Sequence, residues 1–200
     1  MRTAEKLLKI IGVDEAGRGP LAGPVVSAAV IIEERIDGIK DSKILSKRKR
    51  EILFCLIQKK GIALGVGIAN PEEIDQFNIL NASLLSMKRA IKSLELCYFY
   101  HYNSPLENAI VLVDGLFKIP DIFYPQVAIV KGDNKIFEIS AASIIAKVVR
   151  DRMMCAFGKK YPEYELCMHK GYPTKKHREL VKLYGPSPIH RKSFKGVTCE

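Results

Sequence analysis

The sequence contains few cysteines, no tryptophan and no long apolar run. Its five cysteines stand at positions 55, 97, 155, 167 and 199, and none of them forms a C-x-x-C pair. This odd, scattered set predicts neither a disulfide framework nor a zinc site, and it fits a reducing cytoplasm. No apolar stretch approaches the roughly 20 residues that cross a membrane. The first residues, MRTAEK, lack the apolar stretch of a signal peptide. We therefore expect a cytoplasmic protein.

Acidic residues are in the minority. The chain has 32 Lys and Arg against 22 Asp and Glu, which gives a formal net charge of +10. The excess is concentrated near the C-terminus, where His169 and the residues after it include eight basic side chains but only Glu179 and Glu200 as acids. Such a segment favours a polyanionic partner, and nucleic acid is the usual one. Ordinary solubilising charge explains the same excess equally well, so charge alone does not decide.

Short β-branched runs alternate with helical segments, which predicts an α/β protein. The expected strands cover residues 10–13, 23–32, 62–69, 109–115 and 126–133. The expected helices begin near Ser46, which would be the N-cap, and near residues 71, 78, 139 and 174. The first two strands are joined too briefly for a parallel crossover, so the sheet should be mixed. We expect a catalytic domain in residues 1–160 and a basic extension in residues 161–200 that packs on it.

Acidic residues stand at the ends of three expected strands. Asp14 and Glu15 end the first apolar run, Asp114 ends the fourth, and Asp133 follows the fifth. A single Asp after a strand is usually a turn residue or a helix cap. Converging carboxylates, in contrast, repel one another until a divalent cation neutralises them, and oxygen ligands select Mg²⁺ or Mn²⁺. Two such ions about 4 Å apart can stabilise both the attacking and the leaving oxygen of a phosphoryl displacement.

A glycine-rich loop follows the first pair of acids. Gly17 and Gly19 flank Arg18 and remove the Cβ atoms on either side of it. Backbone N–H groups can then approach a ligand closely, and the guanidinium can bind a phosphate or a ribose hydroxyl. A Gly-Arg-Gly tripeptide alone is weak evidence for a binding site. The position of this loop directly after the acids makes the evidence stronger.

Seven motifs occur in one order between Ile10 and Phe194: VDEAGRGPLAGPVV, DSKILS, VDG, KGDNK, ISAASIIAKVVRD, HKGYPTKKH and GPSPIHRKSF. With them the sequence closely resembles the ribonuclease HII family, the type 2 ribonucleases H. The resemblance implies a ribonuclease H-like mixed sheet flanked by helices, with a C-terminal helical extension. It implies endonucleolytic cleavage of the RNA strand of RNA/DNA hybrids and of the 5′ side of ribonucleotides embedded in duplex DNA. Mn²⁺ or Mg²⁺ would serve a two-metal-ion hydrolysis that leaves 3′-hydroxyl and 5′-phosphate ends, and we expect a monomer.

The resemblance also implies roles for single residues. The metal-binding and catalytic acids of the family fall on Asp14, Glu15, Asp114 and Asp133. The loop Gly17-Arg18-Gly19 matches the element that senses the junction between RNA and DNA, and Tyr172 matches the residue that packs against the sugar there. From the motifs DSKILS and HKGYPTKKH we expect Lys43, Ser46 and Lys170 to contact substrate. His169, Lys175, Lys176 and His177 are further candidates for phosphate contacts.

Three interpretations stay open at this stage. His190 and Arg191 either bind phosphate or anchor the tail. Asp151, four residues after Lys147 on an expected helix, fits an ordinary ion pair better than a fourth metal ligand. The rival functions are a non-catalytic hybrid-binding module, which would not need an acidic cluster, and another two-metal nuclease or integrase. The latter would lack the glycine loop and the Tyr172 segment.

Overall fold

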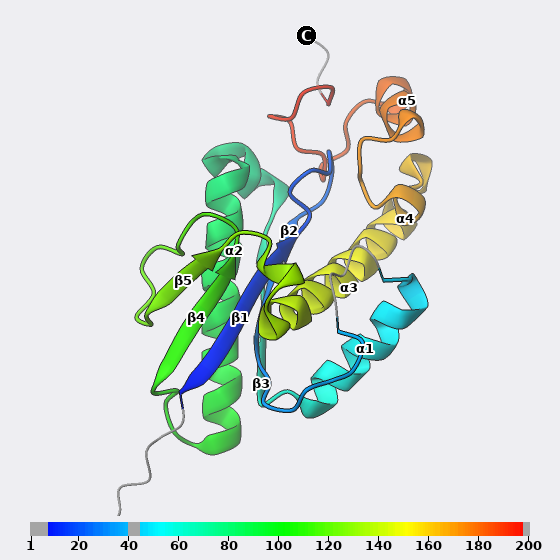
Figure 1. Cartoon of the computed structure of the whole chain (residues 1–200). Helices are drawn as coiled ribbons and strands as arrows, with labels where there is room; N and C mark the ends of the chain where they lie inside the picture. Colours follow the sequence, from blue (N-terminus) through cyan, green and yellow to red (C-terminus); the bar gives the residue numbers. More distant parts are fainter. Residues whose placement is uncertain (1–7, 40–44, 198–200) are drawn as a thin grey trace, which may run out of the picture.

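A single mixed sheet forms the centre of the molecule (Figure 1). The computed structural model describes residues 8–39 and 45–197. The strands are β1 (Lys9–Ala16), β2 (Val25–Ile31), β3 (Ala63–Ala69), β4 (Ala109–Asp114) and β5 (Gln126–Ile129). Their order is β3-β2-β1-β4-β5, with β1 antiparallel to β2, β2 antiparallel to β3, and β4 parallel to both β1 and β5. The predicted mixed α/β sheet is therefore confirmed.

One expected boundary was wrong. The fifth strand ends at Ile129, because Lys131 adopts a left-handed conformation (φ 56°) and turns the chain out of the sheet. The break expected between two helices is confirmed: α2 (Pro71–Tyr102) is kinked at Asn78, which takes a non-helical φ of 65°. The side chain of Asn78 accepts hydrogen bonds from the backbone N–H groups of Leu80 and Asn81, so it caps the second helical part.

Two further helices begin at a side chain that caps their first turn. The hydroxyl of Ser46 accepts from the backbone N–H of Lys49 and starts α1 (Lys47–Lys60), and Thr174 caps α5 (Lys175–Tyr184) in the same way. Such caps stabilise a helix by about 1 kcal/mol. The other helical elements are α3 (Phe137–Lys160), α4 (Leu166–His169) and two 3₁₀ turns at Gly132–Asn134 and Pro162–Tyr164.

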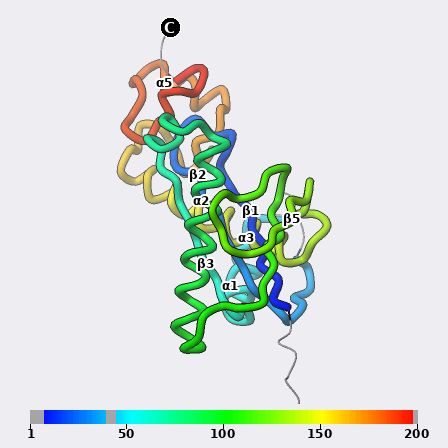
Figure 2. Tube along the Cα trace, turned by 90° about the vertical axis from the view of Figure 1, so that its left-hand side faces the viewer, coloured from blue at the N-terminus to red at the C-terminus, as the bar shows by residue number. Residues whose placement is uncertain are grey.

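Helices cover both faces of the sheet and make three layers (Figures 1 and 2). On one face α2 packs Ile91 and Leu94 against buried residues of β1 and β4. On the other face α1 and α3 pack Ile57 and Ile144 against β2. Burying each such side chain stabilises the fold by about 1.5–3 kcal/mol. Gly12 of β1 lets the start of α3 approach, because a Cβ there would lie 2.1 Å from the backbone of Glu138.

Strand alternation aims two acids at the same face. Val13 and Val113 are paired across β1 and β4 and belong to the core under α2. Because successive side chains of a strand point to opposite faces, Asp14 and Asp114 point to the face covered by α3. The sheet register therefore places these two carboxylates side by side.

Residues 161–197 pack on α3 and on the loop after β1, at one end of the sheet (Figures 1 and 2). A second small core unites Met154 of α3 with Leu166 and Val181 of this segment. Backbone hydrogen bonds join the segment to the loop at Leu21 and Gly23. Within the described parts of the chain, no helix has the length and apolar character needed to cross a membrane.

Candidate active site

Three carboxylates converge at the C-terminal ends of β1 and β4. Asp14, Asp114 and Asp133 each offer an oxygen that lies within 4.8 Å of the others. Asp133 arrives from the 3₁₀ turn after β5, where the backbone N–H of Gly132 donates a 2.6 Å hydrogen bond to Oδ1 of Asp114. Asp14 and Asp133 are buried, with relative exposures of 4% and 3%. The structure thus brings together three of the four acids predicted from the sequence.

Electrostatics make this cluster unfavourable when it is fully ionised. Burial raises the pKa of Asp14 well above its usual value, and the charges of Glu15 and Asp114 raise it further. A hydrogen bond from the side chain of Ser143 and the 2.7 Å bond from the backbone N–H of Glu15 lower this pKa but do not offset the rise. A cation between the carboxylates would remove the penalty.

Glu15 lies beside this group rather than within it. It is not one of the three acids whose oxygens converge, and its Oε1 lies 3.6 Å from Nη1 of Arg18. The carboxyl group still lines the same cavity as Asp14 and Asp114.

A cavity of about 260 Å³ joins three of the predicted acids, Asp14, Glu15 and Asp114, to the glycine loop and to Tyr172, whereas Asp133 does not line it. Its wall consists of Asp14, Glu15, Ala16, Gly17, Arg18, Gly19, Asp114, Ser143, Lys147 and Tyr172. Residues far apart in the sequence, from four of the seven motifs, therefore meet in one small volume.

Gly17 is required for packing. Its φ is +102°, a conformation that other residues rarely adopt, and a Cβ at this position would lie 2.0 Å from Nε of Arg150. A Cβ at Gly19 would meet no atom within 4 Å. Glycine at position 17 thus serves the buried arginine behind the loop, which the sequence interpretation did not foresee.

Two buried arginines hold this loop in place. Arg191 donates to the backbone oxygens of Gly23, Arg18 and Gly17 at 2.9, 2.9 and 2.6 Å. Arg150 donates to the oxygens of Pro24, Ala22 and Lys170 at 3.0–3.1 Å. Both side chains have 0% relative exposure, so Arg191 anchors the tail and does not bind phosphate.

The histidines of the C-terminal segment contact one another inside this segment. His177 is fully buried, and its Nε2 lies 3.1 Å from Nε2 of His190. The prediction that His177 contacts phosphate was therefore wrong, because its ring has no exposed surface. His169 stacks on the same ring, with a centroid distance of 4.2 Å.

Tyr172 presents part of its ring to the cavity. Its side chain is 40% exposed, and the Nζ of Lys147 and the Cζ of Arg150 lie 5.6 and 5.8 Å from the ring centroid. These cations hold the ring in place, so the cavity wall contains a flat apolar surface.

Comparison with known proteins agrees with this geometry. A family model described as Ribonuclease HII matches residues 11–197. The chain belongs to the ribonuclease HII family. It is 50% identical to the ribonuclease HII of Clostridioides difficile, over 94% of this chain and 70% of that protein, and 52% identical to that of Shewanella halifaxensis, over 93% and 87%. The crystal structure of the ribonuclease H2 from Pyrococcus horikoshii OT3 superimposes with a TM-score of 0.71 at 31% identity and 95% coverage of both chains.

Family membership establishes the activity class. Ribonucleases HII cleave the RNA of RNA/DNA hybrids and ribonucleotides in DNA, and they use divalent metal ions. The chain is accordingly an endoribonuclease and a hydrolase.

Two of the expected substrate contacts, Ser46 and Lys170, do not line the candidate active-site cavity. The hydroxyl of Ser46 caps α1, and the side chain of Lys170 hydrogen-bonds to Cys155 and to the backbone of Cys167. Lys43 lies outside the described residues. Their predicted roles in substrate binding stay predictions.

Sequence reasoning missed Ser143 and Lys147 as cavity residues. Both belong to α3 and are four residues apart, so they share one helix face. Lys147 also forms the predicted pair with Asp151, at 2.7 Å. The signal was present in the helix spacing, but nothing in the sequence showed which face of α3 meets the acids.

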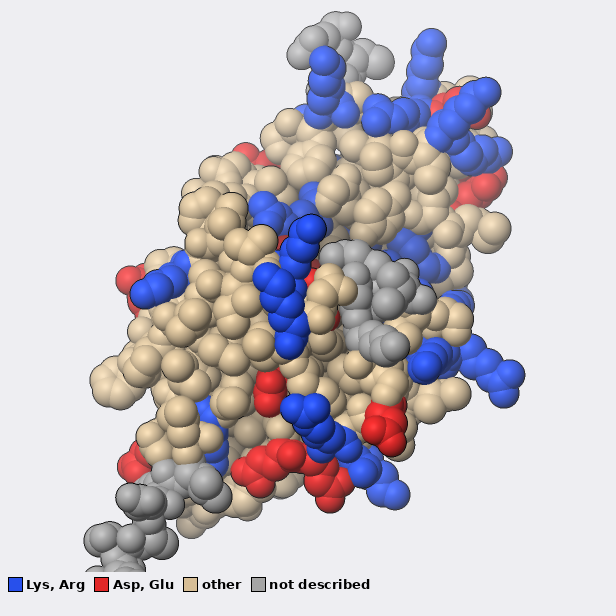
Figure 3. Space-filling model, viewed as in Figure 1, with Lys and Arg blue, Asp and Glu red and all other residues tan. Residues whose placement is uncertain are grey.

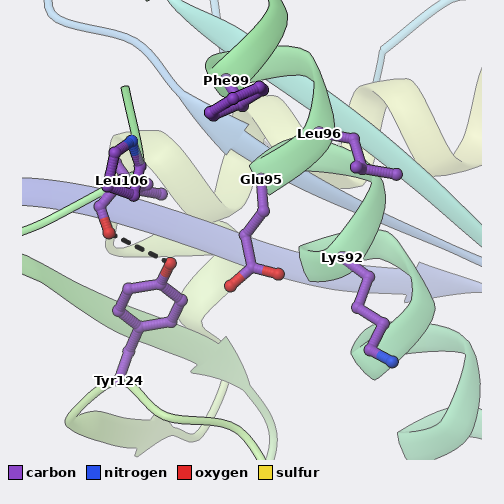
Figure 4. Close-up of a pocket in the computed structure, with 7 residues that line it drawn as sticks. Lys92, Glu95, Leu96, Phe99, Leu106 and Tyr124 are labelled. Carbon is purple, nitrogen blue, oxygen red and sulfur yellow. Dashed lines mark hydrogen bonds between the residues drawn. The ribbon is translucent and has the colours of Figure 1, made fainter. Parts of the chain in front are cut away.

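A larger cavity, of about 500 Å³, lies at the far end of α2 (Figure 4). The hydroxyl of Tyr124 donates to the backbone oxygen of Leu106 at 3.4 Å, and burial and Glu95 raise the pKa of this phenol. Lys92 and Phe99 complete much of its wall. It contains none of the predicted site residues, so it is not the candidate active site.

Proposed function

We propose that Asp14, Glu15, Asp114 and Asp133 hold Mg²⁺ or Mn²⁺ at a phosphate of a ribonucleotide-containing duplex, and that the chain, acting as a monomer, hydrolyses the bond on the 5′ side of the ribonucleotide. The products would carry 3′-hydroxyl and 5′-phosphate ends. The single observation that supports this most is the cavity that joins Asp14, Glu15 and Asp114 to the glycine loop and Tyr172. The cytoplasm is the proposed compartment, since DNA lies there in bacteria such as those of the curated relatives.

The donor set fits a hard divalent cation. Three carboxylate oxygens lie within 4.8 Å of one another, and two of the acids are buried. Oxygen ligands of this kind suit Mg²⁺ and Mn²⁺. When bound, the ions would polarise the scissile phosphate and lower the pKa of water for the attack. Asp14 and Asp114 owe their fixed positions to paired strands, so they would hold this charge without rearrangement.

Ribose recognition is assigned to the glycine loop and Tyr172, which line the same cavity as the acids. The 2′-hydroxyl is the group that distinguishes RNA from DNA. Arg18 and the backbone of Gly17 lie beside the acids, where they can reach this hydroxyl and the neighbouring phosphate. The exposed face of Tyr172 would pack against the next sugar, and Lys147 adds a positive charge beside it.

The C-terminal segment is the proposed duplex-binding surface. Lys and Arg side chains gather over this end of the molecule (Figure 3). Because Arg191 is buried, the exposed cations that remain in this part of the described chain are Lys175, Lys176, Arg178, Lys182, Lys192 and Lys195. If they neutralise about six phosphates, log K should fall with log salt at a slope of about −5.

The experiment is cleavage of a DNA duplex that holds one ribonucleotide, with Mg²⁺, Mn²⁺ or chelator, followed by mapping of the product ends. We expect cleavage on the 5′ side of the ribonucleotide only when a divalent cation is present. Asp14→Asn and Asp114→Asn should lower the cleavage rate at least a hundredfold, because loss of a residue that merely supports a metal ligand already costs up to about a hundredfold. Both variants should still bind the duplex.

Asp121→Asn is the matched control. Asp121 is an exposed acid that pairs with Lys88 at 3.1 Å, outside the cavity, so its substitution should leave the rate unchanged. Undiminished cleavage in chelator, or 2′,3′-cyclic phosphate ends, would contradict the proposed site and reaction.

A further inference from the structure

Two cysteines from different helices face each other about two helical turns beyond Lys147 along α3, outside the cavity of the acids. Cys155 lies on α3 and Cys167 on α4, and the side chain of Cys167 hydrogen-bonds to the Cys155 thiol. Twelve positions separate them in the sequence, with no C-x-x-C spacing. They meet only because the chain reverses direction between α3 and α4.

Gly158 makes this approach possible. A Cβ at position 158 would lie 3.0 Å from the backbone nitrogen and 3.4 Å from the Cβ of Cys167. Because glycine has no side chain, the backbone of α4 packs directly on α3 at this point. Cys155 lies one helical turn before Gly158 on the same face, so the two thiols become neighbours.

An ammonium group bridges the two thiols. Nζ of Lys170 lies 3.0 Å from Sγ of Cys155 and 3.8 Å from Sγ of Cys167, and it also donates to the backbone oxygen of Cys167. Burial raises the pKa of Cys155, but hydrogen bonds from Cys167 and Lys170 and the charges of Lys170 and Lys47 outweigh it, so the net pKa is lowered. A cation beside a thiol favours the thiolate, which is the reactive form.

The pair is also accessible to a small reagent. A cavity of about 270 Å³ opens beside Cys155, and its wall contains four basic residues, Lys47, Arg152, Lys159 and Lys170, and two acids, Glu51 and Asp151. Cys167 is exposed. Cys155 lies beside a cation, is accessible to reagents and has a second thiol next to it. These are the features of an oxidation-sensitive cysteine.

We propose that Cys155 and Cys167 are an oxidation site at which a hydroperoxide converts the two thiols to a disulfide that fastens α4 to α3. The sulfur of Cys155 attacks a peroxide oxygen, the O–O bond breaks, and the products are a sulfenic acid and water or an alcohol. The thiol of Cys167 then attacks that sulfur, the S–O bond breaks and water leaves. Two thiols lose two electrons in total, and one hydroperoxide gains them.

The experiment uses the full chain with Cys55, Cys97 and Cys199 replaced by serine, so that the pair alone remains. Hydrogen peroxide should remove both thiols, with a mass loss of two hydrogen atoms per chain and a peptide link between positions 155 and 167, and dithiothreitol should reverse it. Adding Cys167→Ser should leave a sulfenic acid at Cys155 that dimedone traps. Adding Lys170→Met should slow oxidation at least about threefold, because loss of the ammonium reduces the fraction of Cys155 present as thiolate. The remaining thiolate becomes more nucleophilic, but this offsets only part of the loss. Lys159→Met, in the same cavity wall, should not.

Three results would overturn the proposal. The first is gain of oxygen atoms at Cys155 without a disulfide while Cys167 is present. The second is a disulfide between two chains instead of within one. The third is oxidation of Cys155 no faster than that of Cys55 in the otherwise unsubstituted protein.

Discussion

Arg191 reaches from the C-terminal segment to the active-site loop and donates a 2.6 Å hydrogen bond to the backbone oxygen of Gly17. The segment therefore supports the loop from behind, in addition to any contact with a duplex. Burial and the nearby charge of Arg150 lower the pKa of Arg191 to about 9, so it stays protonated at neutral pH. Its charge is offset by backbone oxygens, since no acid hydrogen-bonds to its guanidinium among the described residues.

Replacing Arg191 with Lys should destabilise the fold even though the charge is kept. An ammonium cannot reproduce three hydrogen bonds from one planar group, and the loss should amount to about 3 kcal/mol. Urea unfolding followed by circular dichroism measures it. The exposed Arg35→Lys should change stability by less than about 0.5 kcal/mol. Equal unfolding midpoints for the two variants would mean that Arg191 is not a structural support.

Asp14→Asn should have opposite effects on activity and on stability without metal. In chelator the variant should be more stable than the natural chain by about 1 kcal/mol or more, because a neutral amide removes the cost of burying a charge and the repulsion with Glu15 and Asp114. Mn²⁺ should raise the melting temperature of the natural chain by mass action and that of the variant far less. Asp121→Asn should respond to Mn²⁺ as the natural chain does. An equal rise for Asp14→Asn would remove Asp14 from the cation site.

The buried histidine pair should make the fold sensitive to mild acid. Burial lowers the pKa values of His177 and His190 to about 4, from an ordinary value of 6.5. Since these folded-state values are depressed, the stability is complete above pH 6.5 and is lost as pH falls towards 4. The loss should be on the order of 3 kcal/mol for the pair. Urea midpoints between pH 7.5 and 4.5 measure it.

The control is a chain with both histidines changed to glutamine, which should start less stable but lose less on acidification. His101→Gln alters an exposed histidine of α2 and should keep the slope of the natural chain. Identical slopes for the double variant and the natural chain would assign the acid sensitivity to other groups.

Tyr172→Ala should reduce cleavage at a single ribonucleotide by roughly a hundredfold, the cost of a misplacement of about 1 Å. Tyr172→Phe should retain most of the rate, because the proposed contact uses the ring and not the hydroxyl. Tyr100→Ala, at an 87% exposed position of α2, is the matched control. Steady-state cleavage rates of the three variants on the one-ribonucleotide duplex test this role of Tyr172. A Tyr172→Ala rate equal to that of Tyr100→Ala would exclude ring packing as a means of positioning.

Local pattern predicted most of the elements, because each carries its own signal. Ser46 and Thr174 cap helices, and β-branched runs form the strands. The acids after the strands could be foreseen for the same reason, since strand ends meet at one edge of a sheet. The roles of Arg150 and Arg191 could not be foreseen, because a buried arginine differs from an exposed one only through distant backbone oxygens. The Cys155–Cys167 pair likewise depends on the packing of α4 against α3. Gly158 permits this packing, but no residue spacing in the sequence predicts it.

The fourth acid of the site should be Asp133 and not Asp151. An oxygen of Asp133 lies within 4.8 Å of those of Asp14 and Asp114, whereas Asp151 pairs with Lys147 at 2.7 Å and lies 4.0 Å from Arg50. Both side chains are largely buried and both substitutions to Asn keep the volume, so each variant controls for the other.

Asp133→Asn should lower turnover by at least about a hundredfold, because it removes a proposed ligand of the cation and not merely a support of one. Asp151→Asn should lower stability by about 1 kcal/mol through its lost ion pairs and should change the rate less than tenfold. The measurement is the cleavage rate over a Mn²⁺ titration, together with urea unfolding of both variants. If Asp151→Asn lost the rate and Asp133→Asn kept it, the fourth carboxylate would belong to α3, and the observed convergence of Asp133 with Asp14 would have no part in catalysis.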